Sequence, residues 1–166
     1  MKNRKIKVLR IVIAFLLAAD MITIFAFSAQ KAEQSDGTST GVIRVLAEMF
    51  YPGFESLTAE KQLSVVQGLQ FVVRKAAHMT EFASLGVLLC AFAFTFGEKF
   101  KWFLLSYLFG VFYAATDEIH QLFVEGRSGQ FSDILIDSFG VMIGMTVFYF
   151  VVKIILVIKR KRSKTA

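Results

Sequence analysis

The sequence has few of the residues that form disulfides, thiolate metal sites or irregular linkers. Among its 166 residues it has one cysteine, Cys90, and one proline, Pro52. A single cysteine excludes an intramolecular disulfide and any CxxC redox or zinc motif. Because Cys90 lies within an apolar run, we expect it to be a small core residue and not a catalytic thiol. The low proline content also argues against a disordered or collagen-like chain.

Charged residues are scarce as well. They make up 19% of the chain, whereas hydrophobic residues make up 55% and phenylalanine alone occurs 19 times. A soluble domain of this length has too little interior to bury so much apolar surface. The composition therefore predicts an integral membrane protein, and we expect one domain covering residues 1–166.

Four apolar stretches are long enough to cross a hydrocarbon core about 30 Å thick. They cover about residues 8–27, 72–96, 102–123 and 134–158. A short linker at residues 97–101 and a turn-forming segment at residues 125–129 separate the last three. The sequence therefore predicts an all-α membrane protein with four transmembrane helices.

Basic residues at the two ends of the chain predict its orientation. Five lie before or at the start of the first span and five follow the last (Lys2, Arg4, Lys5, Lys7, Arg10, Lys159, Arg160, Lys161, Arg162 and Lys164). Because basic residues near span ends stay in the cytoplasm, we expect both termini there, including a basic tail at residues 159–166. The outer segment, residues 28–71, then faces outward. Basic clusters beside apolar runs favour membrane lipids, and not nucleic acid, as partners.

The first span has a second interpretation. Its basic start and the sequence Ala26-Phe27-Ser28 before Ala29 resemble a cleavable signal peptide. The length of the apolar stretch and Asp20 within it favour a retained span.

The outer segment has apolar residues at helical spacing. The first set (Val42, Val45, Leu46, Met49 and Phe50) ends at the turn-forming Tyr51-Pro52-Gly53, and the second (Leu63, Val66, Leu69 and Val73) follows a capping residue, Thr58. We expect these to be short amphipathic helices on the outer leaflet, covering the ends of the spans.

Polar residues gather at the span ends that this orientation places outside. The candidates for catalysis are His78, Glu81, Asp117, Glu118 and His120, and the candidates for ligand binding are Ser28, Gln30, Lys75, Gln121, Arg127, Asp133 and Asp137. Ionisable groups within a membrane are costly and usually line a cavity or pair with one another. We therefore predict one polar pocket that opens outward. The structural alternatives are a network of ion pairs that only fixes helix packing and, for Arg74, Glu125 and Gln30, exposure to water at helix ends.

Several motifs resemble the VanZ family. They are Phe27-Ser28-Ala29-Gln30, Arg74-Lys75-Ala76-Ala77-His78-Met79-Thr80-Glu81-Phe82, Leu85-Gly86, Asp117-Glu118-Ile119-His120-Gln121 with Gly126-Arg127, and Asp133-Ile134-Leu135-Ile136-Asp137-Ser138-Phe139-Gly140. The resemblance runs from about Phe25 to Gly144 and departs at Glu125, where a proline often precedes the Gly-Arg pair. It implies a small bacterial membrane protein, and the family's namesake is associated with low-level teicoplanin resistance. It implies no settled reaction.

Three functions are compatible with such a pocket. The first is an enzyme that acts at the outer leaflet on a lipid or lipid-linked envelope precursor. In it His78 or His120 would serve as a base oriented by Glu81 or Glu118, and Lys75 and Arg127 would hold a phosphate. The second is a binding or accessory protein without turnover, and the third is an ion or proton transporter. The nitrogen and oxygen donors would also suit a divalent metal, although no spacing is diagnostic of one.

Small residues on the fourth span predict a close helix contact. Gly140 and Gly144 form a small-xxx-small pair on the face that carries Asp137. The sequence predicts neither an oligomeric state nor the order of the helices in the bundle.

Overall fold

The computed structural model describes residues 2–165, and this part of the chain contains helices and connecting segments only. The helices are α1 (Lys2–Ser28), α2 (Ala32–Phe50), α3 (Ala59–Phe94), α4 (Phe100–Gln121) and α5 (Phe131–Thr165), with a short 3₁₀ helix, η1 (Phe54–Ser56), before α3. The predicted all-α fold is confirmed.

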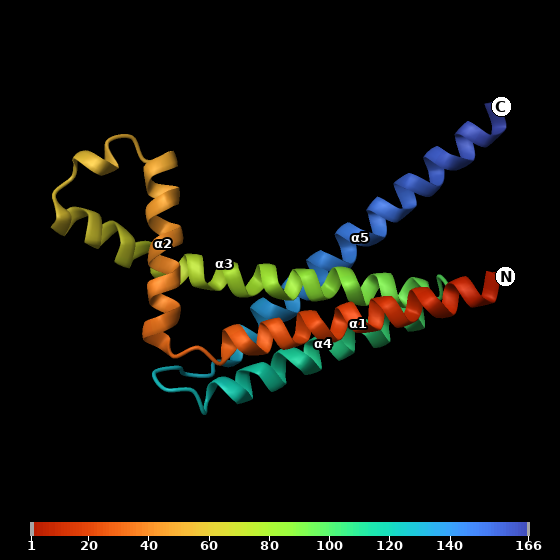
Figure 1. The fold of residues 1–166 in the computed structure, drawn as a ribbon, viewed down its shortest axis with the longest axis horizontal. Helices are drawn as coiled ribbons and strands as arrows, with labels where there is room; N and C mark the ends of the chain where they lie inside the picture. The colour runs from red at the N-terminus through yellow and green to blue at the C-terminus, as the bar shows by residue number, and fades with distance from the viewer. Residues whose placement is uncertain (1, 166) are drawn as a thin grey trace.

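Four of the helices form an elongated bundle (Figure 1). Helices α1, α3 and α4 run side by side along its length, and α5 starts within the bundle and diverges from it towards the C-terminus. Helix α2 runs across the bundle direction at one end, and both chain termini lie towards the other. We call these the α2 end and the terminal end.

Three helices are long and apolar enough to cross a membrane. They are α1 (Asn3–Ser28), α3 (Ala59–Phe94) and α5 (Phe131–Ser163). Helix α4 is not among them, because Lys101 near its start and Asp117 and Glu118 near its end reduce its apolar character. Large apolar side chains are widely exposed on the sides of the bundle (Phe15 74%, Phe112 66% and Phe150 58%). Such a surface suits lipid and not water, and the chain is a membrane protein.

Helix α3 differs from the sequence-based prediction. The expected second outer helix and the span expected to begin near Val72 form one continuous helix of 36 residues. The only proline, Pro52, lies before this segment, so nothing interrupts the backbone hydrogen bonds. At 1.5 Å per residue the helix is about 54 Å long, well beyond a hydrocarbon core of about 30 Å. Its first turns therefore extend past the bundle at the α2 end.

Helix α2 packs through residues other than the apolar set that was expected to face the outer leaflet. The predicted apolar set is exposed (Val42 48%, Val45 57%, Leu46 41%, Met49 68% and Phe50 73%). Ile43 and Ala47 are buried instead, where they pack with Phe54 and Val66 in a small second core. Because η1 and the start of α3 cover the Ile43 face, the apolar set expected to face the outer leaflet is left uncovered. The predicted turn is confirmed, since Gly53 has a left-handed φ of 83°.

The main core lies between α1, α3, α4 and α5. It includes Leu17, Phe82, Leu85 and Val141, together with Cys90, which is buried as expected. Helices α3 and α5 make the closest contact: a Cβ on Gly144 would lie 1.9 Å from the carbonyl oxygen of Ala83. The role predicted for the small-residue pair is therefore confirmed.

A substitution at Gly86 tests this contact from the α3 side. A Cβ there would lie 2.2 Å from the carbonyl oxygen of Val141, which is backbone and cannot rotate away. We expect Gly86→Ala to lower the free energy of unfolding in detergent by about 1–3 kcal/mol, the usual cost of overpacking. Gly68→Ala, on the same helix, is the matched control. With no atom within 4 Å of its Cβ, it should be neutral or stabilising by up to about 1 kcal/mol. Equal effects of the two substitutions would contradict the close contact.

Candidate functional site

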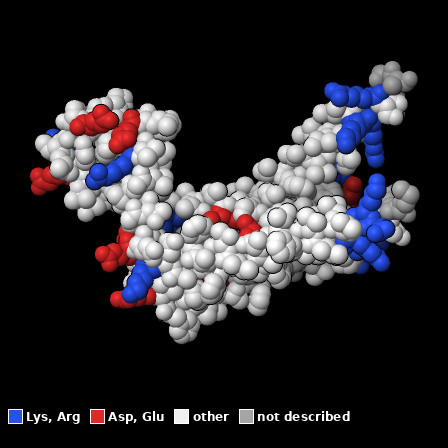
Figure 2. Space-filling model, in the orientation of Figure 1, with Lys and Arg blue, Asp and Glu red and all other residues white. Residues whose placement is uncertain are grey.

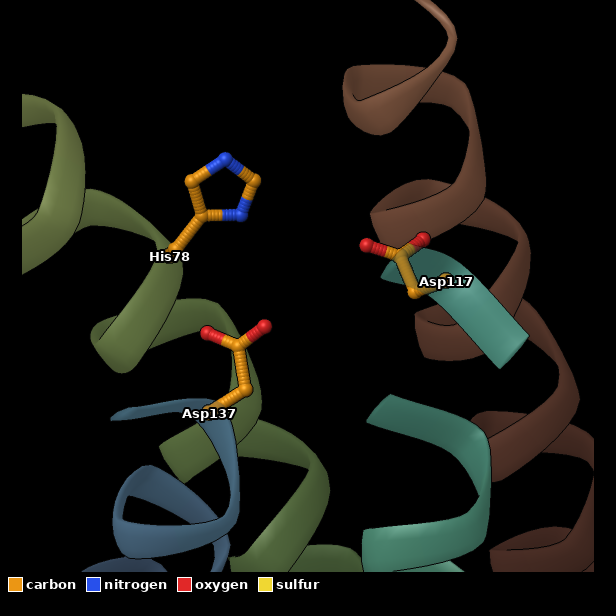
Figure 3. Close-up of side chains that lie close together, drawn as sticks. All are labelled: His78, Asp117 and Asp137. Atoms are coloured by element: carbon orange, nitrogen blue, oxygen red, sulfur yellow. The ribbon is translucent and has the colours of Figure 1, made fainter. Parts of the chain in front are cut away.

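Three helices bring three sequence-predicted residues together: His78 of α3, Asp117 of α4 and Asp137 of α5. One potential ligand atom from each lies within 4.8 Å of the others, and the three side chains converge on one space (Figure 3). Asp117 is 3% exposed and Asp137 is 1% exposed. We call these three residues the His-Asp-Asp cluster.

Asp117 is held by two hydrogen bonds to the same oxygen. Ser28 Oγ, at the end of α1, donates to Asp117 Oδ2 at 2.7 Å, and Gln121 Nε2 donates to it at 3.1 Å. Asp117 Oδ1 is buried and has no hydrogen-bond partner among the described residues. Ser28 and Gln121 were predicted to bind a ligand; the structure shows them orienting a carboxylate.

The other two members of the cluster also have unpaired polar atoms. Both carboxylate oxygens of Asp137, and Nδ1 of His78, are buried without a hydrogen-bond partner in residues 2–165. Glu81 lies one turn further along α3, and its Oε2 is 3.8 Å from Nδ1 of His78. Buried polar atoms in folded proteins are nearly always paired with protein, water or a bound ion, so several unpaired atoms at one point make this a candidate functional site.

Two more predicted residues tie α5 and its preceding loop to the bundle. Lys75 of α3 forms an ion pair with Asp133 of α5. Glu118 Oε2 accepts a hydrogen bond from the backbone N–H of Gln130 at 2.9 Å. Because Lys75 is already paired, Arg127 is the better candidate for holding an anion.

Arg127 lies in the α4–α5 loop, where its Nε donates to the carbonyl oxygen of Gln30 at 3.2 Å. That bond fixes the guanidinium, whose terminal nitrogens make no hydrogen bond within residues 2–165. Burial and, next, the neighbouring Arg74 lower the pKa of Arg127 from its ordinary value. An arginine remains charged after such a shift, so the site holds a partly buried cation.

Two cavities adjoin the cluster, and Arg74, His78 and Arg127 line both. The larger, about 180 Å³, lies between α2, α3 and the end of α1, and its other lining residues are Phe27, Gln30, Ser35, Thr38, Ser39, Ala77 and Glu81. The smaller, about 40 Å³, is completed by Lys75, Gln121, Gly126, Ser128, Gln130 and Asp133. A volume of about 40 Å³ suits a water molecule or single ion, whereas the larger cavity has room for a phosphate group.

Some site residues were not expected from the sequence. Arg74, expected in water, is partly buried and lies 3.4 Å from Asp36 of α2. Ser35 and Ser39 line the larger cavity because α2 folds back against α3. In the sequence, only their spacing of one helical turn indicated that they share a helix face. Many exposed helices have serines at this spacing, so it did not predict a cavity. Glu125 is exposed as expected, paired with Lys31 at 2.6 Å.

His120 is placed differently from the other predicted residues. Its ring stacks on Phe25 of α1 with centroids 4.3 Å apart, and it lines neither cavity. Its Nε2 is buried without a partner in the described chain. Of the two histidines, His78 is therefore the one beside the acidic pair.

Comparison with known proteins gives one match. A family model described as VanZ/LLP1 matches residues 12–154. No curated protein and no solved structure matches the chain. The matched region contains the whole His-Asp-Asp cluster and every residue that lines the two cavities.

Proposed function

Because the chain belongs to the VanZ/LLP1 family, we propose that it binds the phosphate group of a membrane lipid or lipid-linked cell-envelope component at the extracytoplasmic side of the membrane. The observation that carries this proposal is the larger cavity, about 180 Å³, which has Arg74 and Arg127 in its wall. Two guanidinium groups can bind a phosphate through paired charge-assisted hydrogen bonds. Asp36 offsets part of the charge of Arg74, which leaves Arg127 as the main anion-binding group.

The distribution of charge supports the proposed orientation. Lys and Arg gather at the terminal end, around the first and last turns of the chain, whereas acidic residues lie mainly over the α2 end (Figure 2). In the positive-inside arrangement the terminal end is cytoplasmic and the α2 end is extracytoplasmic. Four membrane-crossing helices, with α4 as the fourth, place both termini on the same side.

Helix α2 supports a headgroup-level position for the cavity. It runs across the bundle, and its exposed apolar residues suit the boundary between headgroups and acyl chains (Figure 1). A phosphate bound between α2 and α3 would then lie at the depth of lipid headgroups.

Transport receives less support. Few polar groups lie nearer the terminal end, and most of them have partners. Ser84 Oγ donates to Asp20 Oδ1 at 2.7 Å, and Arg10 Nη2 donates to the carbonyl oxygen of Thr95 at 2.7 Å; Asp20 Oδ2 is buried without a partner among the described residues. The core between these pairs is apolar, with Leu17 and Leu89 buried. A conducted ion would have to cross this segment without polar contacts.

Removing the charge of Arg127 tests the proposal. We expect Arg127→Gln to weaken binding of a polyprenyl phosphate or phosphatidic acid to the detergent-purified chain by about 10-fold to 100-fold, the value of a charge-assisted hydrogen bond. Native mass spectrometry in the presence of a chelator measures this, with phosphatidylcholine as the neutral comparison. Arg44→Gln is the matched control, since Arg44 is exposed on α2 and lines neither cavity.

Equal binding by the Arg127→Gln and Arg44→Gln proteins would overturn the proposal. Preference for the polyprenyl phosphate over phosphatidic acid would identify the lipid-linked component as the source of the phosphate. For the proposed link to glycopeptide resistance, the same pair of variants can be compared by teicoplanin susceptibility in a susceptible host, where only Arg127→Gln should lose the protective effect.

A further inference from the structure

We propose that His78, Asp117 and Asp137 bind a divalent transition-metal ion. Two ligands about 2.1 Å from a metal lie roughly 3–4.2 Å apart. The three potential ligand atoms lie within 4.8 Å of one another already, so small side-chain rotations would bring them to coordination distance. Figure 3 shows the imidazole and both carboxylates facing the same space from three different helices.

The unpaired atoms of the cluster are the evidence that the space is built for a ligand. Asp137, 1% exposed, has no partner for either oxygen, and Asp117 has none for Oδ1. Two carboxylates buried this close repel each other and lose their hydration. The nearby ammonium of Lys75 is paired with Asp133, so it offsets their charge only in part. A dication would neutralise the pair and give a partner to one buried atom of each of the three residues.

The hydrogen bonds around Asp117 would orient it as a metal ligand. Ser28 and Gln121 both donate to Oδ2, which orients the carboxylate and leaves Oδ1 free. Ligands of bound metals are commonly held in this way by hydrogen bonds from neighbouring side chains. A carboxylate that served only to fix helix packing would be expected to have both oxygens engaged.

The donor set favours a particular class of cation. One imidazole nitrogen with two carboxylates suits the ions from Mn²⁺ to Zn²⁺, whereas Ca²⁺ and Mg²⁺ prefer oxygen ligands alone. Three protein ligands leave at least one coordination position open. Because His78 lines both cavities, a metal held by the cluster would lie beside the proposed phosphate site. A contact between metal and phosphate rests on the proposed function, but binding of the metal does not.

The test is binding of metal alone to the full chain in detergent, after treatment with a chelator and without added lipid. We expect one Zn²⁺ or Mn²⁺ per chain by elemental analysis, with affinity measured by titration calorimetry. His78→Gln should weaken binding at least 100-fold. His120→Gln is the matched control and should leave it unchanged, because that ring stacks on Phe25 and is not part of the cluster. Ser28→Ala should weaken binding about 10-fold, through loss of orientation at Asp117.

Absence of stoichiometric metal in the wild type would overturn the inference, as would equal losses in the two histidine variants. If His78→Gln does not fold, Asp137→Asn provides the same test with a side chain of equal size, and retained binding in that variant would also overturn the inference. Phosphate-lipid binding is measured in the presence of chelator, so failure of either proposal leaves the other measurable.

Discussion

Asp137→Asn is expected to stabilise the metal-free protein. The Asp137 carboxylate is buried, has no hydrogen-bond partner among the described residues and lies beside Asp117. An amide of the same size removes the like-charge repulsion and can donate a hydrogen bond to the unpaired Oδ1 of Asp117. Leaving a buried polar group unsatisfied costs about 1–3 kcal/mol, so we expect the free energy of unfolding to rise by about that amount. Thermal or denaturant unfolding in detergent with a chelator measures this.

The control for this stabilisation is Glu48→Gln, the same loss of a negative charge at an exposed position of α2. It should change the free energy of unfolding by less than about 0.5 kcal/mol. A marked loss of stability in Asp137→Asn would mean that the carboxylate holds the helices together. That result would favour a structural polar network over a ligand site. A rise in the free energy of unfolding on removal of the charge would instead be typical of a functional site, where a residue needed for function lowers stability.

The second large effect is an all-or-none pattern of labelling on the two sides of the membrane. In a Cys90→Ala background, a cysteine at Ser64 or Ser128 should react with a membrane-impermeant maleimide in intact cells. A cysteine at Lys99 or Ser163 should react only after permeabilisation. The four positions lie in the first part of α3, the α4–α5 loop, the α3–α4 linker and the basic tail, and all four are exposed.

The comparison between positions 99 and 128 decides the number of spans, because these two residues flank α4. If α4 crosses the membrane, they lie on opposite sides, and Lys99→Cys shares the side of Ser163→Cys. If both react from the same side, α4 does not cross and only the three long apolar helices span the membrane. Reaction of Ser163→Cys in intact cells would contradict the cytoplasmic position of the C-terminus.

The all-α architecture followed from local properties of the sequence. A composition with 55% hydrophobic residues and long uninterrupted apolar runs predicts helices in a membrane, because a helix pairs its own backbone polar groups in lipid. The connections could be located for the same reason, since Gly53, Gly97 and Gly126 each adopt a positive φ where a turn was expected. The burial of Cys90 and the close contact at Gly144 were also predictable, because small residues within apolar runs are usually packed between helices.

The limits of the outer helices were less predictable. Whether residues 59–94 form one helix or two depends on what the first turns pack against. The first turns of α3 pack through Val66 against Ile43 and Phe54, which lie outside α3 in the sequence. The same contact decides which face of α2 is buried, and helical spacing alone cannot choose between two apolar faces.

By itself, the sequence determined the helical class, the membrane character of the chain and the identity of the polar residues, because these depend on composition and on the cost of charge in lipid. Only the tertiary structure decided which polar residues meet. It placed His78 with Asp117 and Asp137, set His120 against Phe25, and brought α2 over Arg74. The order and rotation of helices in a bundle depend on side-chain packing between distant segments, such as Gly86 against Val141, and no local pattern encodes that contact.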